Sequence, residues 1–373
     1  MRTDEVKVNI CHIISGDLWA GAEAQAYTLV KGLSKKNSLK LNVITLNGGY
    51  LTKKIRDSGI KVDVVDEKIN SSLKMVWYIY RILRKKHIDI VHTHGYKETL
   101  LGGFAARLAR IKGIVRTHHG KGVIYGTIYH RFIEKLNTIF FSDNLIAVSE
   151  DLKQYLIANR FQRNHITVIH NGILSEETKP SMSADKLKNA LEIESEALVV
   201  GTMGRMVAVK GHRYFLEGAR KVLSKQDNVV FVIAGDGPLM QESQKEIKQL
   251  GIESKIRLIG FRNDPFDVIN MFDIFVMTSL HEGIPMVLLE AMCLAKPIIA
   301  TKVGGIPEII YDHQNGLLIS PMDSQEFAST CLELIENRVL RKMLANNARK
   351  DFVAKYGVER VTEDTEKLYK GLL

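Results

Sequence analysis

Short apolar runs rich in β-branched residues alternate with longer amphipathic stretches over most of the chain. The first run, VKVNICHIIS at 6–15, is nearly continuous, as expected of a strand buried on both faces of a parallel sheet. The stretch after it, 16–36, places its apolar residues at helical spacing. Such alternation indicates parallel sheets covered by helices on both faces, and therefore an α/β protein. Further runs that we predict to contain strands are 39–46, 61–66, 113–120, 165–173, 197–206, 228–238, 255–261, 297–305 and 315–321.

The alternation is interrupted by a polar stretch at 174–190 and restarts at 197. We expect this stretch to connect two doubly wound domains, because 373 residues exceed what one core comfortably holds. The expected N-terminal domain covers 1–176 and the C-terminal domain covers 177–355. Ligands bind such sheets outside the carboxyl ends of their strands, so we expect the loops there to line a cleft between the two domains. Helices are predicted at 97–111, 124–139, 211–224 and 239–250.

One stretch, HEGIPMVLLEAM, contains two glutamates eight positions apart between an apolar strand and a second strand. Glu282 lies in the loop, and the Gly283-Ile284-Pro285 turn leads into a helix, since proline is tolerated in a first helical turn. The start of that helix can bind an anion, because its first N–H groups are free and the helix dipole is positive there. Glu290 lies on the helix, so the two acids can hold two parts of one extended ligand. The alternative is a pair of solvated glutamates.

Four other loops after predicted strands carry candidate chemistry. Gly21 precedes a helix and allows close approach of a phosphate. His119 ends the run RTHHG, where histidine can donate to a sugar hydroxyl, although a loop histidine is often structural. Arg205 and Lys210 in GRMVAVKG can converge on a diphosphate, or can be solvated cations. The fourth loop, GDGP at 235–238, can be explained as a turn alone.

Composition restricts the class of protein. Hydrophobic content of 45% and charged content of 25% are ordinary for a globular chain, and we find no apolar run of membrane-spanning length and no signal peptide. Three cysteines without ligand spacing suit a reducing cytoplasm. The chain has a net charge of +10, and the excess of positive charge lies in residues 1–180, which contain 28 Lys+Arg and 16 Asp+Glu. Such a surface can meet an anionic lipid, a phosphorylated acceptor or nucleic acid, or simply maintain solubility.

Taken together, these motifs resemble the retaining glycosyltransferases of family 4, which have the GT-B fold of two Rossmann-like domains facing each other across a cleft. The resemblance covers nearly the whole chain and is strongest from 197 to 318. It rests on the ordered motifs TMGRMVAVKGH, VIAGDGP, LIGF, VMTSLHEGIPMVLLEAM, PIIATKVGGIPEII and NGLLI. Two departures are Ala20 before Gly21, where the family often has a second glycine, and Leu174 after VIHNGI, where aspartate is common. The resemblance also implies that a C-terminal helix at 356–373 crosses back to the N-terminal domain.

The resemblance implies a role for each matching residue. Glu290 would accept hydrogen bonds from the ribose of a nucleotide sugar, and Glu282 would hold a hydroxyl of the donor sugar. Arg205 and Lys210 would neutralise the diphosphate and the leaving group. The other expected contacts are the backbone N–H groups around Gly283, Ile284 and Pro285, then Gly21 at the phosphates and His119 at the donor sugar.

No metal or other cofactor is expected, since the chain lacks a D-x-D triplet and the cations can supply the positive charge. UDP is the expected nucleotide from its frequency in the family, and the acceptor is expected to be a polysaccharide, another glycan or a lipid-linked sugar. We expect a cytoplasmic enzyme in glycan biosynthesis, peripheral on anionic membrane if the basic aromatic helix around WYIYRILRKKHI at 77–88 lies in a lipid interface. The same helix can equally be an ordinary sheet-covering helix. Rival interpretations are a nucleotide-sugar epimerase, a phosphorylase, and a basic nucleic-acid-binding protein, although the motifs lie in the half without basic excess.

Overall fold

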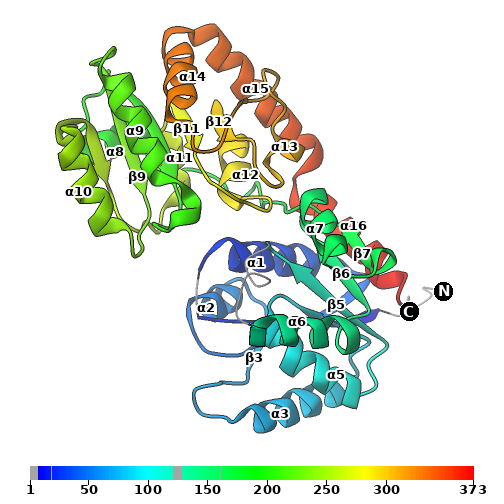
Figure 1. Cartoon of the computed structure of the whole chain (residues 1–373). Helices are drawn as coiled ribbons and strands as arrows, with labels where there is room; N and C mark the ends of the chain where they lie inside the picture. The colour runs from blue at the N-terminus through cyan, green and yellow to red at the C-terminus, as the bar shows by residue number, and fades with distance from the viewer. Residues whose placement is uncertain (1–6, 18, 121–127, 160) are drawn as a thin grey trace. The chain divides into compact units, whose positions relative to one another are not determined.

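The computed structural model describes residues 7–17, 19–120, 128–159 and 161–373. Its contacts divide the chain into two compact units, a first unit of Met1–Gly172 with Val358–Leu373 and a second unit of Ile173–Gly357. In each unit, helices cover both faces of a parallel sheet (Figure 1). The predicted α/β class with two doubly wound sheets is therefore confirmed.

The sheet of the first unit has seven parallel strands in the described part of the chain, in the order β3-β2-β1-β4-β5-β6-β7. Its order reverses direction between β1 and β4, which is the position where open α/β sheets bind ligands. The strands are β1 Val8–Ile14, β2 Leu39–Thr45, β3 Val62–Val64, β4 Ile90–Thr93, β5 Gly113–His118, β6 Asn144–Ala147 and β7 Ile166–Val168.

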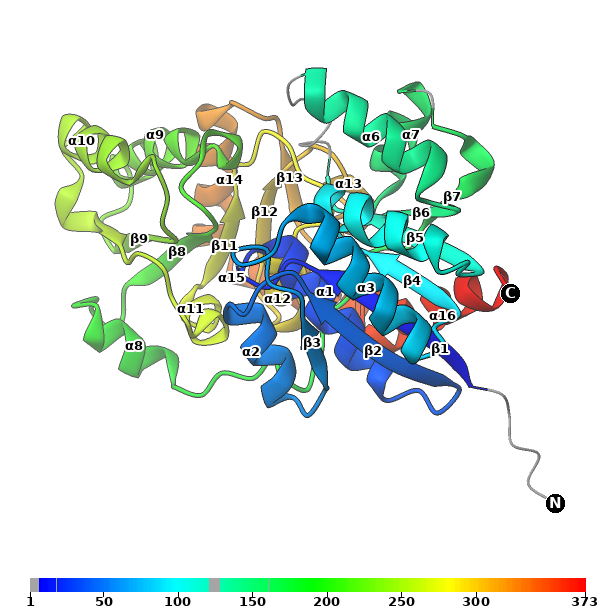
Figure 2. The ribbon, with the colours of Figure 1, turned by 90° about the horizontal axis from the view of Figure 1, so that it is seen from below.

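Alternating residues of β1 pack into two separate apolar clusters, one on each face of this sheet. Ile10 belongs to the cluster of helices α1 and α16, whereas Cys11 and Ile13 belong to the cluster of α3 and α5. Figure 1 shows α1 and α3 on opposite faces of the sheet, and Figure 2, seen from below, shows α3 in front of the strands. The helices of this unit are α1 Gly21–Ser34, α2 Tyr50–Asp57, α3 Ser72–Lys85, α4 Tyr96–Glu98, the π-helix η1 Thr99–Gly103, α5 Phe104–Leu108, α6 Ile128–Phe140, α7 Glu150–Ala158, the 3₁₀ helix η3 Arg163–His165 and α16 Val358–Lys370.

The C-terminal helix α16 is part of the first unit although it ends the chain. It packs closely along α1, where a Cβ on Gly32 would lie 2.5 Å from Cγ2 of Val358. Tyr369 near its end is fully buried. A large side chain at position 32 would therefore separate the two helices.

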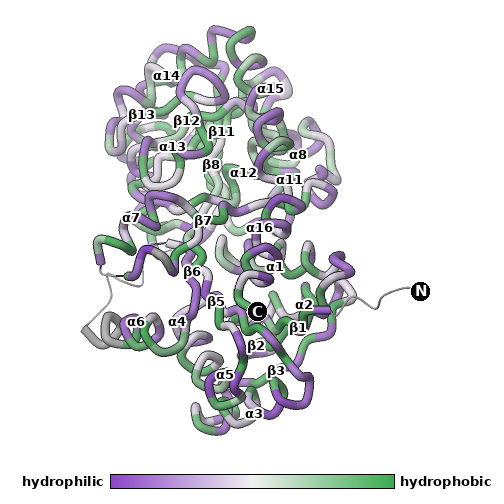
Figure 3. Tube along the Cα trace, turned by 90° about the vertical axis from the view of Figure 1, so that its right-hand side faces the viewer, coloured by the Kyte–Doolittle hydropathy of each residue, from purple (hydrophilic) through white to green (hydrophobic). Residues whose placement is uncertain are grey.

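The sheet of the second unit has six parallel strands among the described residues, in the order β10-β9-β8-β11-β12-β13. Figure 3 shows hydrophobic stretches along β8 and β11, as expected of strands covered on both faces. The strands are β8 Leu198–Met203, β9 Val229–Ala234, β10 Ile256–Leu258, β11 Ile274–Met277, β12 Ile298–Thr301 and β13 Leu317–Ile319. The helices are α8 Ala184–Ala190, the 3₁₀ helices η4 Ala208–Lys210 and η5 Glu253–Lys255, α9 His212–Leu223, α10 Met240–Leu250, α11 Pro265–Met271, α12 Met286–Cys293, α13 Ile306–Ile309, α14 Ser324–Glu336 and α15 Arg338–Lys355.

Three segments differ from the sequence prediction. The polar stretch 174–190 ends in helix α8, which Ser183 caps by accepting a hydrogen bond from the Lys186 N–H at 3.3 Å. The single helix predicted at 97–111 is divided by a π-helical segment at 99–103. The helix predicted at 124–139 is found as α6, but its first residues, 124–127, lie outside the described part of the chain.

Candidate functional site

The loop between β8 and α9 holds Arg205 and Lys210 at the carboxyl end of the sheet of the second unit. Hydrogen bonds from the Val207 N–H to the Arg205 carbonyl and from the Lys210 N–H to the Val207 carbonyl fold it tightly. The GDGP loop supports it from behind, since a Cβ on Gly235, which has φ +145°, would lie 1.8 Å from the Gly204 carbonyl oxygen. The GDGP motif therefore has a structural role, as its turn composition allowed.

Lys210 and Glu282 come from loops after adjacent strands and meet directly. The Lys210 ammonium donates to Oε1 of Glu282 at 2.6 Å, and the Ser279 hydroxyl donates to the same oxygen at 2.7 Å. No contact is found for the other carboxylate oxygen, Oε2, within the described residues. One oxygen of Glu282 is thus fixed by the protein, while the other can accept from a ligand.

Two glycines allow the loops that carry Lys210 and Glu282 to approach closely. Gly211 has φ +64°, and a Cβ there would lie 2.1 Å from the Thr278 carbonyl oxygen, so the Lys210 loop approaches the end of β11 closely. Gly304 has φ +55°, and a Cβ there would lie 1.9 Å from the Glu282 carbonyl oxygen. Both positions therefore combine a left-handed backbone with close contact, which glycine alone tolerates without strain.

Arg205 presents an exposed guanidinium for which the described residues offer no hydrogen-bond or ion-pair partner. Its carbonyl oxygen contacts Nε2 of His212 at 3.1 Å, which fixes the backbone rather than the side chain. A permanently charged guanidinium in the loop that also carries Lys210 is suited to an anion with several oxygens.

Glu290 lies on α12, five residues into a helix that starts at Met286. Burial raises the pKa of its carboxyl group to about 7, and no described side chain compensates its charge. The helix was predicted to start near Pro285; it starts at Met286 with Pro285 at the N-cap position, and no side chain caps the first turn. The first N–H groups of α12 therefore remain available to a ligand.

The first unit positions the remaining predicted residues. Gly21 starts α1, and a Cβ there would meet nothing within 4 Å, so the space in front of it is open. Gly16, which follows β1, has no such space, because a Cβ there would lie 2.3 Å from Oγ1 of Thr52. Protein packing explains Gly16, whereas open space at Gly21 suits the approach of a ligand.

The side chains of the RTHH run differ in how deeply they are buried. Arg116 is buried and forms a two-pronged pair with Glu134, with contacts of 2.6 and 2.7 Å. His118 is buried in β5 and packs edge-on against Phe161, while His119 follows the strand and is partly exposed. Burial, together with the Arg116 charge, lowers the pKa of His119 to about 4, so it is neutral at pH 7. His119 is thus the histidine of this run with access to a ligand.

The structure brings Lys210 and Glu282 together, and it places Arg205 in the same loop as Lys210 and Glu290 on the helix that follows Glu282. Gly21 and His119 belong to the other unit and are positioned within it. Two residues that position Glu282 were not predicted from the sequence. Ser279 donates to its carboxylate, and Gly304 allows close packing against its backbone. Gly304 belongs to a glycine pair that follows a predicted strand, but only the fold shows that it approaches the backbone of Glu282. His12, His92 and His94, whose ring nitrogens lie within 4.8 Å of one another, were also missed.

Comparison with known proteins identifies the family. The sequence model of "Glycosyltransferase Family 4" matches residues 19–177, and that of "Glycosyl transferases group 1" matches residues 183–351. The chain is 27% identical to an Escherichia coli protein described as UDP-Gal:alpha-D-GlcNAc-diphosphoundecaprenol alpha-1,3-galactosyltransferase, over 99% of this chain and 98% of that protein. It is 26% identical to the capsular polysaccharide biosynthesis glycosyltransferase CapM of Staphylococcus aureus, over 92% of this chain and 93% of that protein.

Among solved structures, that of HepE from Anabaena in complex with UDP-glucose superimposes with a TM-score of 0.86 at 21% identity, covering 97% of this chain and 99% of the other. This likeness shows the GT-B-like fold that the sequence predicts. With two family models matching in sequence along most of the chain, the protein is a glycosyltransferase of family 4.

Proposed function

We propose that this enzyme transfers a sugar from a UDP-linked donor to a hydroxyl of a glycan or lipid-linked acceptor, with retention at the anomeric carbon. The observation that supports this most is the arrangement of Arg205, Lys210 and Glu282 at the carboxyl ends of β8 and β11. These strands flank the reversal of the strand order in the second sheet, where ligands of such folds bind.

The charged side chains of the site match the diphosphate and the sugar of a nucleoside diphosphate sugar. Arg205 carries a positive charge that no described residue neutralises, and it suits the diphosphate. Lys210 uses one of its three N–H donors on Glu282, so the other two can contact the diphosphate while the pair lies beside the sugar. The open Oε2 of Glu282 is an acceptor for a sugar hydroxyl.

Glu290 is proposed to hold the ribose. A carboxylate can accept from two neighbouring hydroxyls, and its compensation by a ligand would account for an acid that the protein leaves half-buried without a partner among the described residues. The uncapped first turn of α12 supplies N–H groups that suit the leaving diphosphate.

In the proposed reaction, the bond between the anomeric carbon and the β-phosphate oxygen breaks, and the acceptor oxygen bonds to the same face of that carbon. The acceptor proton passes to the released phosphate oxygen, so UDP leaves with the balancing proton. Arg205 and Lys210 stabilise the charge that grows on the diphosphate.

The choice of UDP and of the acceptor class draws support from relatives. The Escherichia coli relative is named for a UDP-Gal donor and a sugar carried on diphosphoundecaprenol, and the HepE structure contains UDP-glucose. An epimerase is the alternative enzyme. It would convert the sugar of the donor, or release UDP, without forming a new glycosidic bond.

Titration calorimetry with UDP tests the donor site. We expect Arg205→Ala to weaken UDP binding by about tenfold or more, because charge-assisted hydrogen bonds are worth roughly 1.5–3 kcal/mol. Arg213→Ala is the matched control, since Arg213 is an exposed arginine of the same unit paired with Glu217. Equal affinity of the Arg205 variant and the wild type would contradict the site.

A transfer assay separates the enzyme classes. A panel of UDP-sugars is incubated with and without polyprenyl-diphosphate sugars, and products are identified by mass spectrometry. A new disaccharide on the lipid carrier is expected. An altered UDP-sugar formed without acceptor would instead identify an epimerase.

The outer face of α3 supports the proposal that the enzyme works on an anionic membrane. Leu73 is 80% and Trp77 is 51% exposed, and the guanidinium of Arg81 lies 4.7 Å from the centroid of the Trp77 ring. Helix α3 contains no acidic residue, so large apolar groups and cations share this face. That combination suits a lipid interface. The other exposed basic and aromatic residues of α3 are Lys74, Tyr78, Arg84 and Lys85.

Nothing in the described part of the chain forms a helix long and apolar enough to span a bilayer. Binding through the α3 face is therefore tested with vesicles. Vesicles rich in anionic lipid should sediment the protein at low salt and release it at high salt, and Trp77→Ser should weaken this binding. Equal sedimentation of the variant and the wild type would exclude this face.

A further inference from the structure

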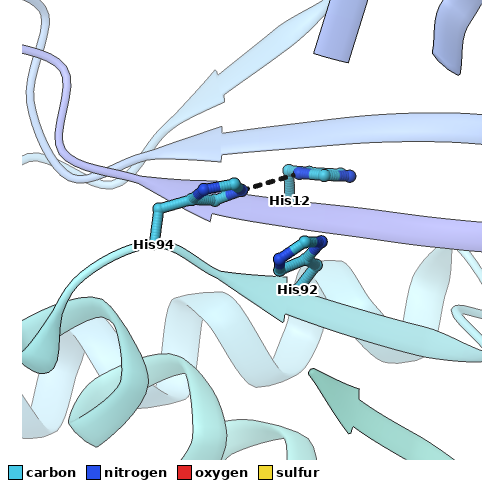
Figure 4. A group of neighbouring side chains, drawn as sticks. All are labelled: His12, His92 and His94. Atoms are coloured by element: carbon cyan, nitrogen blue, oxygen red, sulfur yellow. Dashed lines mark hydrogen bonds between the residues drawn. The ribbon is translucent and has the colours of Figure 1, made fainter. Parts of the chain in front are cut away.

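Three histidines and a tyrosine gather inside the first unit, outside the roles assigned above. His12 in β1 and His92 in β4 face each other as register partners, His94 follows β4, and Tyr369 comes from α16. His12, His92 and Tyr369 are completely buried, and His94 keeps 8% of its surface exposed. Figure 4 shows the three imidazole rings at this point of the sheet.

These side chains form one continuous series of hydrogen bonds. Thr117 Oγ1 lies 2.7 Å from Nε2 of His92, whose Nδ1 lies 2.6 Å from the hydroxyl of Tyr369. The same hydroxyl lies 3.2 Å from Nε2 of His12, whose Nδ1 lies 3.0 Å from Nε2 of His94. Nδ1 of His94 ends the series, buried and without a partner among the described residues. Such an unpaired polar atom costs stability and calls for an explanation.

A metal ion does not explain the group. The rings of His92 and His94 are stacked, with centroids 4.5 Å apart and planes at 19°, and those of His12 and His94 lie at 24°. The lone pair of an imidazole nitrogen lies in the plane of its ring, so nearly parallel stacked rings cannot aim at one ion. The hydrogen bonds also occupy the nitrogens that would have to bind it.

Each member is neutral at pH 7. Burial lowers the pKa of His12 to about 3 and those of His92 and His94 well below the usual value, and it raises the pKa of Tyr369. Every histidine therefore carries one N–H, and the tyrosine keeps its proton. Each contact then needs one donor and one acceptor, so the tautomers of the three histidines depend on one another.

The roles of the imidazole nitrogens depend on the tautomers, and the distances favour one of the two directions in which the series can run. Hydroxyl donors make shorter hydrogen bonds than N–H donors. The 2.6 Å contact is thus the Tyr369 hydroxyl donating to Nδ1 of His92, and the 3.2 Å contact is Nε2–H of His12 donating to the tyrosine oxygen. His12 then has a bare Nδ1, which accepts from Nε2–H of His94. Nδ1 of His94 is left as a bare lone pair.

We propose that Nδ1 of His94 accepts a hydrogen bond from a sugar hydroxyl of the substrate, and that Tyr369, acting through His12, fixes the tautomer that leaves this nitrogen unprotonated. Its position suits binding, because His94 follows β4 at the reversal of strand order in the first sheet. The His119 ring lies beside it, with centroids 5.8 Å apart, and Nε2 of His119 also lacks a partner among the described residues. Two aligned, unpaired imidazoles suit a ligand rich in hydroxyls.

Nitrogen-15 NMR of histidine-labelled protein tests the tautomer without substrate. Long-range proton–nitrogen correlations should show Nε2–H for His12, His92 and His94 in the wild type. In Tyr369→Phe, which keeps the ring and removes the hydroxyl, His12 and His94 should become tautomeric mixtures. A proton on Nδ1 of His94 in the wild type, or an unchanged pattern in the variant, would overturn the proposal.

Kinetics test the contact, which rests on the proposed sugar transfer. The amide of glutamine can replace Nε2 of histidine, whereas that of asparagine can replace Nδ1. We expect His94→Gln, which keeps the contact to His12 and loses the acceptor, to lower kcat/KM about tenfold. His94→Asn should retain more activity than His94→Gln, and the exposed control His313→Gln should match the wild type.

The outcomes separate this proposal from the proposed function. UDP binding in the second unit together with wild-type kinetics of both His94 variants would contradict the contact alone. Absence of UDP binding and of transfer would contradict the proposed function, while the NMR result would still decide the tautomer. One equivalent of tightly bound zinc in the purified protein, lost in His12→Gln, would replace the proposal with a metal site.

Discussion

Replacing Glu290 by glutamine should make the second unit more stable while weakening donor binding. Burial raises the pKa of this carboxyl group to about 7 from the usual 4.5, so the folded state binds its proton more tightly than the unfolded state does. The stability associated with this proton is fully present below pH 4.5 and is lost as the pH rises through 7. At pH 8 the wild type therefore holds an unfavourable charge that Glu290→Gln removes.

The size of the effect follows from the shift. At 1.36 kcal/mol per pKa unit, ionising the group in the fold costs at most about 3 kcal/mol. The side chain keeps part of its surface in contact with solvent, which reduces the gain to about 1–2 kcal/mol. For a unit of this size, that corresponds to a rise in Tm of roughly 2–8 °C at pH 8.

Differential scanning calorimetry of both proteins between pH 5 and 8 measures the difference, and UDP titration at pH 8 measures the loss of binding. We expect the stability difference to grow with pH and UDP affinity to fall about tenfold, because a carboxylate–hydroxyl contact is lost. A variant less stable than the wild type at pH 8, or a difference independent of pH, would refute the reasoning. Unchanged UDP affinity would refute the ribose role alone.

Three further predictions concern the supports of the site and the core. Gly304→Ala should reduce UDP affinity and destabilise the second unit by more than about 1 kcal/mol, because position 304 has a left-handed backbone and the new Cβ would displace the Glu282 backbone that it approaches; unchanged melting and binding would contradict this. Arg116→Met should cost about 3–5 kcal/mol by leaving Glu134 buried and unpaired, and Glu134→Leu in the same chain should recover much of that loss in urea denaturation. Burial raises the pKa of the Cys331 thiol, so iodoacetamide should modify it only in unfolded protein, as mass spectrometry of native and urea-treated samples can show.

The sequence predicted the features that depend on local pattern. Continuous apolar runs marked the parallel strands, and the two glutamates of HEGIPMVLLEAM marked the strand–turn–helix that carries Glu282 and Glu290. The role predicted for Lys210 at a diphosphate stays a prediction, and its contact with Glu282 at 2.6 Å was not predicted. That contact joins loops 72 positions apart, so only the order of the strands reveals it.

Features that depend on register were not predicted. His12 and His92 become neighbours because β1 and β4 pair, although 80 residues separate them. Histidines at 92 and 94 have the spacing that directs side chains to one side of an extended chain, although His94 follows β4, and this spacing was a usable signal. No sequence pattern indicated that Tyr369 contacts these histidines, since His12 lies 357 positions away at the other end of the chain.

The return of α16 to the first unit has a consequence for synthesis on the ribosome. Tyr369 contacts His12 across a separation of 357 residues, so the first unit cannot complete its core until the last residues have been translated. At roughly 5–20 residues per second, the nascent first unit must wait about ten seconds or more after its strand β7 emerges. The second unit is continuous in sequence and can finish folding before that helix appears. The half of the enzyme that is made first is therefore the half that matures last.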